Sequence, residues 1–181
     1  MSIEIRGLKE SELSDHSRLV HQSYYEYVAS GERTFLADPD WWLKGARADP
    51  YYRPEQTRVM VMDGRLVASV TNYTRDVYAD GRIAKVGCIG SVCTHPDYRR
   101  RGLVRQVLAE SIAWMEQNGY HWSFLFGKED VYGGSGWRIV TAFELIADLR
   151  LRGDAPTDAQ VRPADPEQDV ATLASIYERF N

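Results

Sequence analysis

The spacing of hydrophobic and polar residues changes along this chain, and each change predicts a different element of secondary structure. Residues 3–6 have the composition of a short strand. Residues 11–28 place apolar side chains on one face at helical spacing, which predicts an amphipathic helix. Asp38-Pro39-Asp40 is a signal for a helix start, and a short helix carrying Trp41 and Trp42 is expected after it.

The middle of the chain contains apolar runs of β type that are separated by turn signals. Residues 59–62 and 66–73 flank Asp63-Gly64, a strong signal for a tight hairpin. Asp80-Gly81 repeats this signal just before residues 83–94. These runs predict three consecutive antiparallel strands.

From Leu103 to Met115 the period becomes helical, and Gly119 suits the left-handed position that ends a helix. Residues 122–126 predict a strand that is apolar on both sides and therefore central, and residues 139–151 predict a further extended run. The order is strand, two helices, three strands, helix, strand, short helix and strand. It predicts an α/β (α+β) fold with a mixed, mostly antiparallel sheet flanked by helices.

The C-terminal part of the chain echoes the N-terminal part. Residues 153–160 are rich in Gly, Pro, Asp and Thr and predict a linker, so the main domain is expected to span residues 1–152. Val161-Arg162-Pro163 and the apolar spacing after it repeat features of Ile5-Arg6-Gly7 and the first helix. Residues 161–181 are therefore either the start of a second module, which we favour, or a C-terminal helix that packs on the single domain.

Composition narrows the class of protein. The chain has 181 residues, of which 44% are hydrophobic and 27% charged, as expected of one soluble globular domain. A net charge of −4 argues against general binding to nucleic acid. Because it contains neither a membrane-length apolar run nor a signal peptide after Met1, we expect a cytoplasmic protein without a membrane partner. Cys88 and Cys93 have no metal-binding spacing, so we expect them in the core and expect no metal.

The strongest functional signal is the stretch from Ser91 to Val104. An apolar strand ends there, a polar turn follows, and Arg99-Arg100-Arg101-Gly102 opens the amphipathic helix. A helix N-terminus offers unpaired N–H groups and partial positive charge, and the arginines add to that charge. Gly102 allows a ligand to approach the backbone closely. Because the rest of the chain is not basic, this pattern indicates a site for the pyrophosphate of a small ligand.

This stretch resembles motif A of the GNAT N-acetyltransferase superfamily, Arg/Gln-x-x-Gly-x-Gly/Ala, with Arg99, Gly102 and Val104 at its three marked positions. Val104 departs from Gly or Ala, and in detail the stretch is most similar to the Eis-like branch. The resemblance covers Ile3 to about Arg152. It implies a GNAT fold, in which the sheet splays at the motif A strand, and an N-terminal module that binds acetyl-CoA as cosubstrate.

The resemblance also implies the residues that hold acetyl-CoA. Backbone groups of the bulged strand pair with the pantetheine arm, an N–H near Val92 faces the thioester oxygen, and the first turn of the helix holds the pyrophosphate. In this sequence the expected cofactor-binding residues are Val92, Cys93, Thr94, Arg99, Arg100, Arg101, Gly102, Leu103, Val104 and Arg105.

A candidate general acid lies in the segment from Phe126 to Trp137, which resembles motif B of the Eis-like branch. Tyr132 matches the tyrosine that protonates the departing thiolate in that branch. Ser135 stands where the branch has phenylalanine, in a Gly-rich run that is neither a P-loop nor a Gly-x-Ser-x-Gly motif. Tyr132 is thus the predicted catalytic residue.

The general base remains unassigned. Glu26 has the character of a solvated helix face and His95 that of a turn residue. Eis-like enzymes use the carboxylate at the end of a later domain, which this chain does not obviously carry.

Two functions follow from these residues. The first is N-acetyl transfer from acetyl-CoA to a primary amine of a small molecule or protein, with the acceptor beside residues 24–27 and Trp41-Trp42. The alternative is a non-catalytic acyl-CoA-binding or regulatory module, which Ser135 and the missing base favour. The sequence leaves the oligomeric state open, a homo-oligomer included.

Overall fold

The structure is a computed structural model, in which the chain divides into two units, Met1–Val140 and Thr141–Asn181. The residues that the structure describes are 2–31, 37–79, 81–127, 132–138, 140, 162–165 and 167–180.

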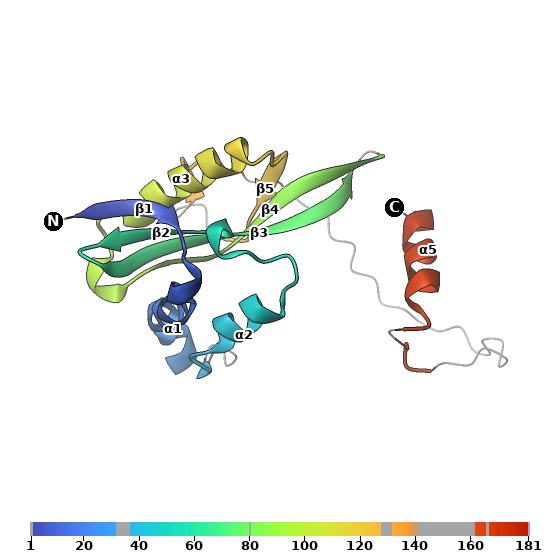
Figure 1. Ribbon diagram of the computed structural model, residues 1–181, viewed down its shortest axis with the longest axis horizontal. Coiled ribbons are helices and arrows are strands. Elements are labelled where there is room, and N and C mark those ends of the chain that lie inside the picture. Colours follow the sequence, from blue (N-terminus) through green and yellow to red (C-terminus); the bar gives the residue numbers. More distant parts are fainter. Residues whose placement is uncertain are drawn as a thin grey trace. The chain divides into compact units, whose positions relative to one another are not determined.

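The first unit is a five-stranded sheet with helices on both faces (Figure 1). The strands follow the order β1-β2-β3-β4-β5, and all neighbours are antiparallel except β4 and β5, which are parallel. This arrangement confirms the predicted mixed α/β fold. In chain order the elements are β1 (Ile3–Gly7), η1 (Glu10–Glu12), α1 (Leu13–Ala29), α2 (Trp41–Ala48), η3 (Pro54–Gln56), β2 (Thr57–Met62), β3 (Arg65–Ala79), β4 (Arg82–Thr94), η4 (Pro96–Tyr98), α3 (Leu103–Gln117) and β5 (Trp122–Phe124).

The turn signals have their expected conformations. Asp63 and Gly64 adopt φ values of 47° and 79° in the hairpin between β2 and β3, where Asn, Asp and Gly are the favoured residues. Gly119 has a φ of 72° just beyond Asn118, the residue that caps the C-terminus of α3, as its position in the sequence predicts. Gly81 has a φ of 75° in the β3–β4 turn, whereas Asp80 lies outside the described residues.

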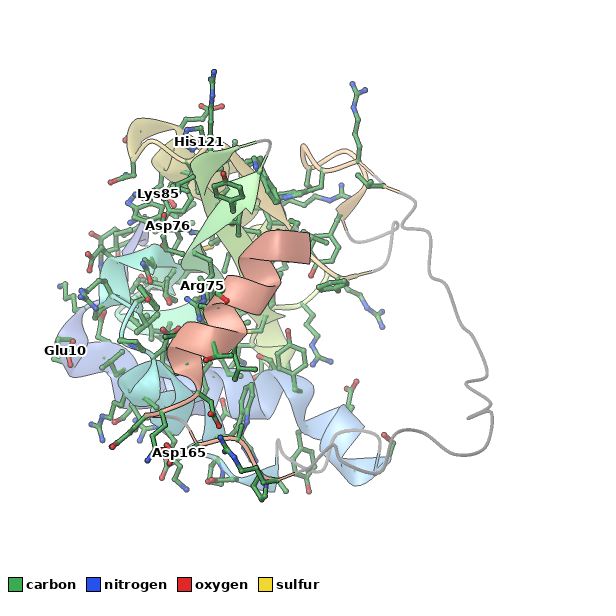
Figure 2. The ribbon with its side chains drawn as sticks, turned by 90° about the vertical axis from the view of Figure 1, so that its right-hand side faces the viewer. Glu10, Arg75, Asp76, Lys85, His121 and Asp165 are labelled. Carbon is green, nitrogen blue, oxygen red and sulfur yellow. The ribbon has the colours of Figure 1, made fainter. Side chains whose placement is uncertain are left out.

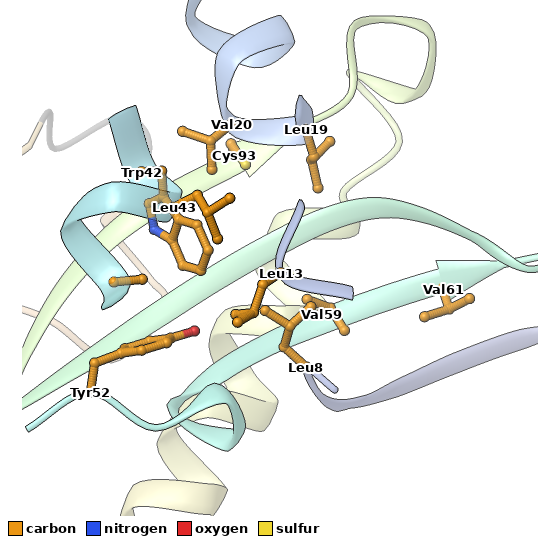
Figure 3. Close-up of a cluster of buried hydrophobic side chains, with 11 residues drawn as sticks. Leu8, Leu13, Leu19, Val20, Trp42, Leu43, Tyr52, Val59, Val61 and Cys93 are labelled. Atoms are coloured by element: carbon orange, nitrogen blue, oxygen red, sulfur yellow. The ribbon is translucent and has the colours of Figure 1, made fainter. Parts of the chain in front are cut away.

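One hydrophobic cluster lies on each face of the sheet. The helices α1 and α2 cover one face, and α3 covers the other (Figure 1). The α1–α2 cluster is shown in Figure 3. Its buried residues are Leu8, Leu13, Leu19, Val20, Trp42, Leu43, Ala46, Tyr52, Val59, Val61 and Cys93. The α3 cluster is built on Val107, Leu108 and Met115, which confirms the apolar face read from the sequence.

The feature of the sheet that matters most for function is a bulge in β4. Thr71 of β3 pairs with Gly90, but Ser69, two residues earlier, pairs with Cys93. Three residues of β4 therefore span the distance that two residues of β3 cover, which defines a β-bulge at residues 91–92. On its other side β4 pairs with β5 only over Val86–Cys88. Beyond that point, no other described strand pairs with this edge of β4.

Some expectations fall outside the described residues. The strand predicted for residues 139–151 does so apart from Val140, and the predicted linker 153–160 does so entirely. Among the described strands β5 lies at the edge of the sheet and pairs only with β4, so its predicted central placement is not confirmed. No helix in the described parts of the chain is long and apolar enough to cross a membrane.

The second unit contains α5 (Val170–Phe180) and a hydrogen-bonded corner just before it. There the Arg162 guanidinium donates to both carboxylate oxygens of Asp169 at 2.7 Å and to the carbonyl of the next residue at 3.0 Å. Before α1, Arg6 donates to both oxygens of Glu12 at 2.8 and 2.7 Å and to the carbonyl of the next residue at 3.0 Å. The sequence echo between the two ends of the chain thus extends to side-chain hydrogen bonds.

Candidate functional site

A pocket of about 230 Å³ lies at the N-terminus of α3. All predicted cofactor-binding residues except Val92 and Cys93 line it, and Tyr98 joins them. The arrangement is local, because the polar turn, the arginines and the helix start are consecutive in the sequence. The pocket therefore combines positive side chains with the N–H groups that the first turn of a helix leaves without intrahelical partners.

The backbone at this helix start is left-handed at two positions. Arg100 has a φ of 61° and Gly102, the residue that caps α3, has a φ of 69°. A Cβ added at Gly102 would meet nothing within 4 Å. In the free protein there is room for a side chain at this position. The glycine is needed because residues with a side chain adopt this backbone conformation only with strain.

The arginines of this pocket have different roles. Arg99 turns toward α1, where its guanidinium donates to the Ser23 carbonyl at 2.7 Å and to the Glu26 carboxylate at 2.9 Å. Arg101 donates to the Asp97 carbonyl at 3.1 Å. Within the described parts of the chain, neither Arg100 nor Arg105 forms an ion pair or hydrogen bond through its guanidinium. These two side chains are therefore available to an anion, whereas Arg99 joins the helix start to α1.

The β4 bulge presents the backbone of Val92 in a defined direction. The Ser69 hydroxyl on β3 donates to the Ser91 carbonyl at 3.2 Å. The C=O and N–H of a trans peptide group point in opposite directions, so the N–H of Val92 points away from β3. That direction leads to the edge of β4 that β5 leaves unpaired beyond Cys88. The use of this N–H toward a ligand stays a prediction.

The side chains of the same segment are packing residues, as the sequence led us to expect. Val92 packs against the α3 cluster, and Cys93 is buried in the α1–α2 cluster. Burial raises the pKa of the Cys93 thiol to about 11, so this thiol is neutral. Helix α1 forms two hydrogen bonds with the backbone of β4. The Tyr24 hydroxyl donates to the Val92 carbonyl at 2.6 Å, and the Ser23 hydroxyl donates to the Thr94 carbonyl at 3.1 Å.

Tyr132 lies in a second pocket, of about 570 Å³, together with residues of β5 and the segment that follows it. The ring packs so closely on Gly127 that a Cβ there would lie 2.1 Å from a ring carbon. Burial raises the pKa of the Tyr132 phenol above its usual value, so it is protonated at neutral pH. Trp137, which the sequence analysis assigned no role, lines the same pocket and donates to the Ser123 hydroxyl at 3.1 Å.

The residues considered for the acceptor and the base have structural contacts. Trp42 is buried, and its indole N–H donates to the Tyr73 hydroxyl at 3.0 Å. Glu26 forms the ion pair with Arg99. His95 accepts a hydrogen bond from the Asp97 N–H at 3.2 Å and so caps η4, as expected of a turn residue. Across the described residues, no group of His, Cys, Asp and Glu side chains has the arrangement of a metal site.

The bulged β4, the turn after it and the arginine-lined start of α3 define a GNAT fold. The chain matches the acetyltransferase (GNAT) domain family over residues 4–140 and belongs to that family. None of the curated proteins matches it significantly in sequence.

Solved structures confirm the fold. A GCN5-related N-acetyltransferase from Ralstonia eutropha is 22% identical, with a TM-score of 0.59, over 81% of this chain and 99% of that chain. A glucosamine-6-phosphate N-acetyltransferase from Arabidopsis thaliana is 15% identical, with a TM-score of 0.56, over the same shares. An aminoglycoside N-acetyltransferase in complex with CoA is 15% identical, with a TM-score of 0.54, over 81% of this chain and 95% of that chain.

Proposed function

We propose that this protein transfers an acetyl group from acetyl-CoA to a primary amine of a small molecule or protein. The observation that carries the proposal is the pocket at the start of α3, where Arg100 and Arg105 accompany the free N–H groups of the helix. Its charge and backbone donors suit the pyrophosphate of CoA. The CoA complex of the aminoglycoside acetyltransferase, which has the same fold, supports this choice of cosubstrate.

The rest of the site supplies the chemistry of acyl transfer. The acyl arm follows the unpaired edge of β4, where the N–H of Val92 donates to the thioester oxygen as negative charge develops on it. Tyr132 gives its phenolic proton to the thiolate that leaves. Its raised pKa means that the phenol carries its proton before the reaction begins.

Assignment to the Eis-like branch rests on the motif resemblance around Arg99 and Tyr132. Of the two acceptor classes, a small molecule is favoured over a protein, because aminoglycoside and glucosamine-6-phosphate acetyltransferases share the fold. The rival function, a non-catalytic acyl-CoA-binding module, keeps the pocket and lacks turnover. Acetyl-CoA turnover with a panel of aminoglycosides, polyamines, amino acids and lysine peptides separates the two.

Binding of CoA is tested with two matched glycine variants. Gly102 and Gly119 lie at opposite ends of α3, have φ values of 69° and 72°, and have no atom within 4 Å of an added Cβ. Gly102→Val and Gly119→Val therefore introduce similar backbone strain. We expect Gly102→Val alone to abolish CoA binding in calorimetric titrations. Equal CoA affinity in the two folded variants would refute the placement of the pyrophosphate.

A further inference from the structure

A network of buried polar side chains lies behind the β4 bulge, and both of its branches end on Ser91. In the first branch, His16 Nε2 lies 2.9 Å from Ser69 Oγ, and Ser69 Oγ donates to the Ser91 carbonyl at 3.2 Å. In the second branch, the Trp42 indole N–H donates to the Tyr73 hydroxyl at 3.0 Å, and that hydroxyl lies 3.0 Å from Ser91 Oγ. The network joins α1 and α2 to the bulge.

The direction of each hydrogen bond in the first branch follows from the donors available. Ser69 has one hydroxyl hydrogen, which the Ser91 carbonyl takes, so Ser69 Oγ accepts from its other partners. These partners are His16 Nε2 and, at 3.1 Å, Cys93 Sγ. His16 therefore carries a hydrogen on Nε2, and burial, which lowers its pKa to about 3, keeps the ring neutral. The ring nitrogen Nδ1 is buried without a partner among the described residues.

In the second branch only the first hydrogen bond has a fixed direction. The Trp42 indole can only donate, so the Tyr73 hydroxyl accepts from it, whereas in the bond between the Tyr73 hydroxyl and Ser91 Oγ either oxygen can be the donor. The His16 and Trp42 rings are in edge contact at 4.1 Å between centroids, which packs the two branches together. Gly90, just before Ser91, makes room for Tyr73: a Cβ there would lie 2.9 Å from a carbon of its ring.

Ser91 needs such support, because it is a non-glycine residue with a φ of 46°. A residue with a side chain is strained in this backbone conformation, which persists only where contacts with surrounding groups hold it. Here one branch holds the carbonyl oxygen of Ser91 and the other holds its side chain. Since the carbonyl is fixed toward β3, the N–H of Val92 in the same peptide group is fixed toward the open edge of β4.

We propose that Ser69 and Tyr73 are positioning residues for acyl transfer, which hold the Ser91–Val92 peptide group so that its N–H meets the thioester oxygen. The proposal rests on the proposed acetyltransferase function. Neither side chain touches the substrate; both act through Ser91. Through His16 and Trp42 the network also makes the orientation of this N–H depend on the positions of α1 and α2, which lie on the side of the sheet where the acceptor is expected.

The test compares Ser69→Ala and Tyr73→Phe with a matched control, Tyr52→Phe. Tyr52 belongs to the same cluster and contacts Trp42 at 5.6 Å between ring centroids, but its hydroxyl bonds to Thr57 at 2.8 Å and not to β4. We expect kcat to fall at least about tenfold in Ser69→Ala and Tyr73→Phe, because a misdirected oxyanion donor loses part of its effect. The KM for acetyl-CoA should stay within about twofold, since the pyrophosphate site is unchanged.

A double-mutant cycle tests the route of the effect. If Tyr73 acts through the Ser91 hydroxyl, Tyr73→Phe should lower kcat no further in a Ser91→Ala background. A kcat for Ser69→Ala and Tyr73→Phe equal to that of Tyr52→Phe, with similar thermal stability in all three, would show a purely structural network and overturn the proposal.

A spectroscopic readout separates this proposal from the proposed function. In ¹H–¹⁵N spectra, the Val92 amide should shift on addition of acetyl-CoA in the wild type and Tyr52→Phe, and shift less in Tyr73→Phe. This measurement remains decisive if the wild type binds acetyl-CoA without turnover, the outcome that would refute acetyl transfer itself. An identical Val92 shift in all three proteins would refute the positioning role even if transfer is confirmed.

Discussion

The replacement Tyr132→Phe tests the general acid most directly. It removes one hydroxyl and keeps the ring that packs on Gly127 and the α3 cluster. Among the described residues, none forms a hydrogen bond with this hydroxyl. The change in unfolding free energy should therefore stay within about 0.5 kcal/mol, as for substitutions that break no specific contact.

The effect on catalysis should be far larger than the effect on stability. General acid catalysis contributes roughly 10²–10⁴-fold, which corresponds to about 3–5 kcal/mol in the activation barrier. Because burial raises the pKa of Tyr132 above the usual value near 10, the phenol stays protonated across neutral and mildly alkaline pH. The ratio of wild-type to Tyr132→Phe rates should therefore be constant between about pH 7 and 9.

The assay is single-turnover acetyl transfer, because slow product release would hide the effect in kcat. Tyr120→Phe is the matched control: Tyr120 is half-buried against the same α3 cluster, and its hydroxyl bonds to Thr74. CoA affinity should be unchanged in both variants, and the single-turnover rate should fall only in Tyr132→Phe. A wild-type rate in Tyr132→Phe would mean that solvent protonates the thiolate, and Tyr132 would not be the acid.

Two further predictions concern stability. The neutral, buried His16 has a pKa lowered to about 3, so the unfolded state takes up its proton first as the pH falls. Its contribution to the free energy of unfolding is complete above about pH 6.5 and is lost toward pH 3, by up to about 4–5 kcal/mol. Urea unfolding at several pH values should show this fall in the wild type and a shallower fall in His16→Gln. We also predict that residues 161–181 begin a second module, since the hydrogen bonds of Arg162 with Asp169 repeat those of Arg6 with Glu12 at the start of the first unit. Amide exchange should then be faster in α5 than in α3, and equally slow exchange would show a helix that belongs to the main domain.

The sequence alone determined the features whose signals are local. The helical spacing from Leu103 to Met115 predicted the buried face of α3, and Asp63-Gly64 predicted the β2–β3 hairpin. The pocket at the start of α3 was also predictable, because Arg99 to Arg105 are consecutive and the backbone alone brings them together. The general acid Tyr132 stays a prediction of the same kind, read from one short segment.

Tertiary structure decided the features that join distant segments. No local pattern shows that Arg99 pairs with Glu26 or that the Trp42 indole bonds to Tyr73. The left-handed conformation of Ser91 is similar: serine has no preference for it, and the two side chains that bond to Ser91, Ser69 and Tyr73, come from the neighbouring strand β3. A hydrogen bond between remote segments depends on how the helices pack on the sheet and on the register of β3 and β4. Hydrophobic periodicity predicts which face of an element is buried, and only the assembled sheet determines which polar groups meet behind it.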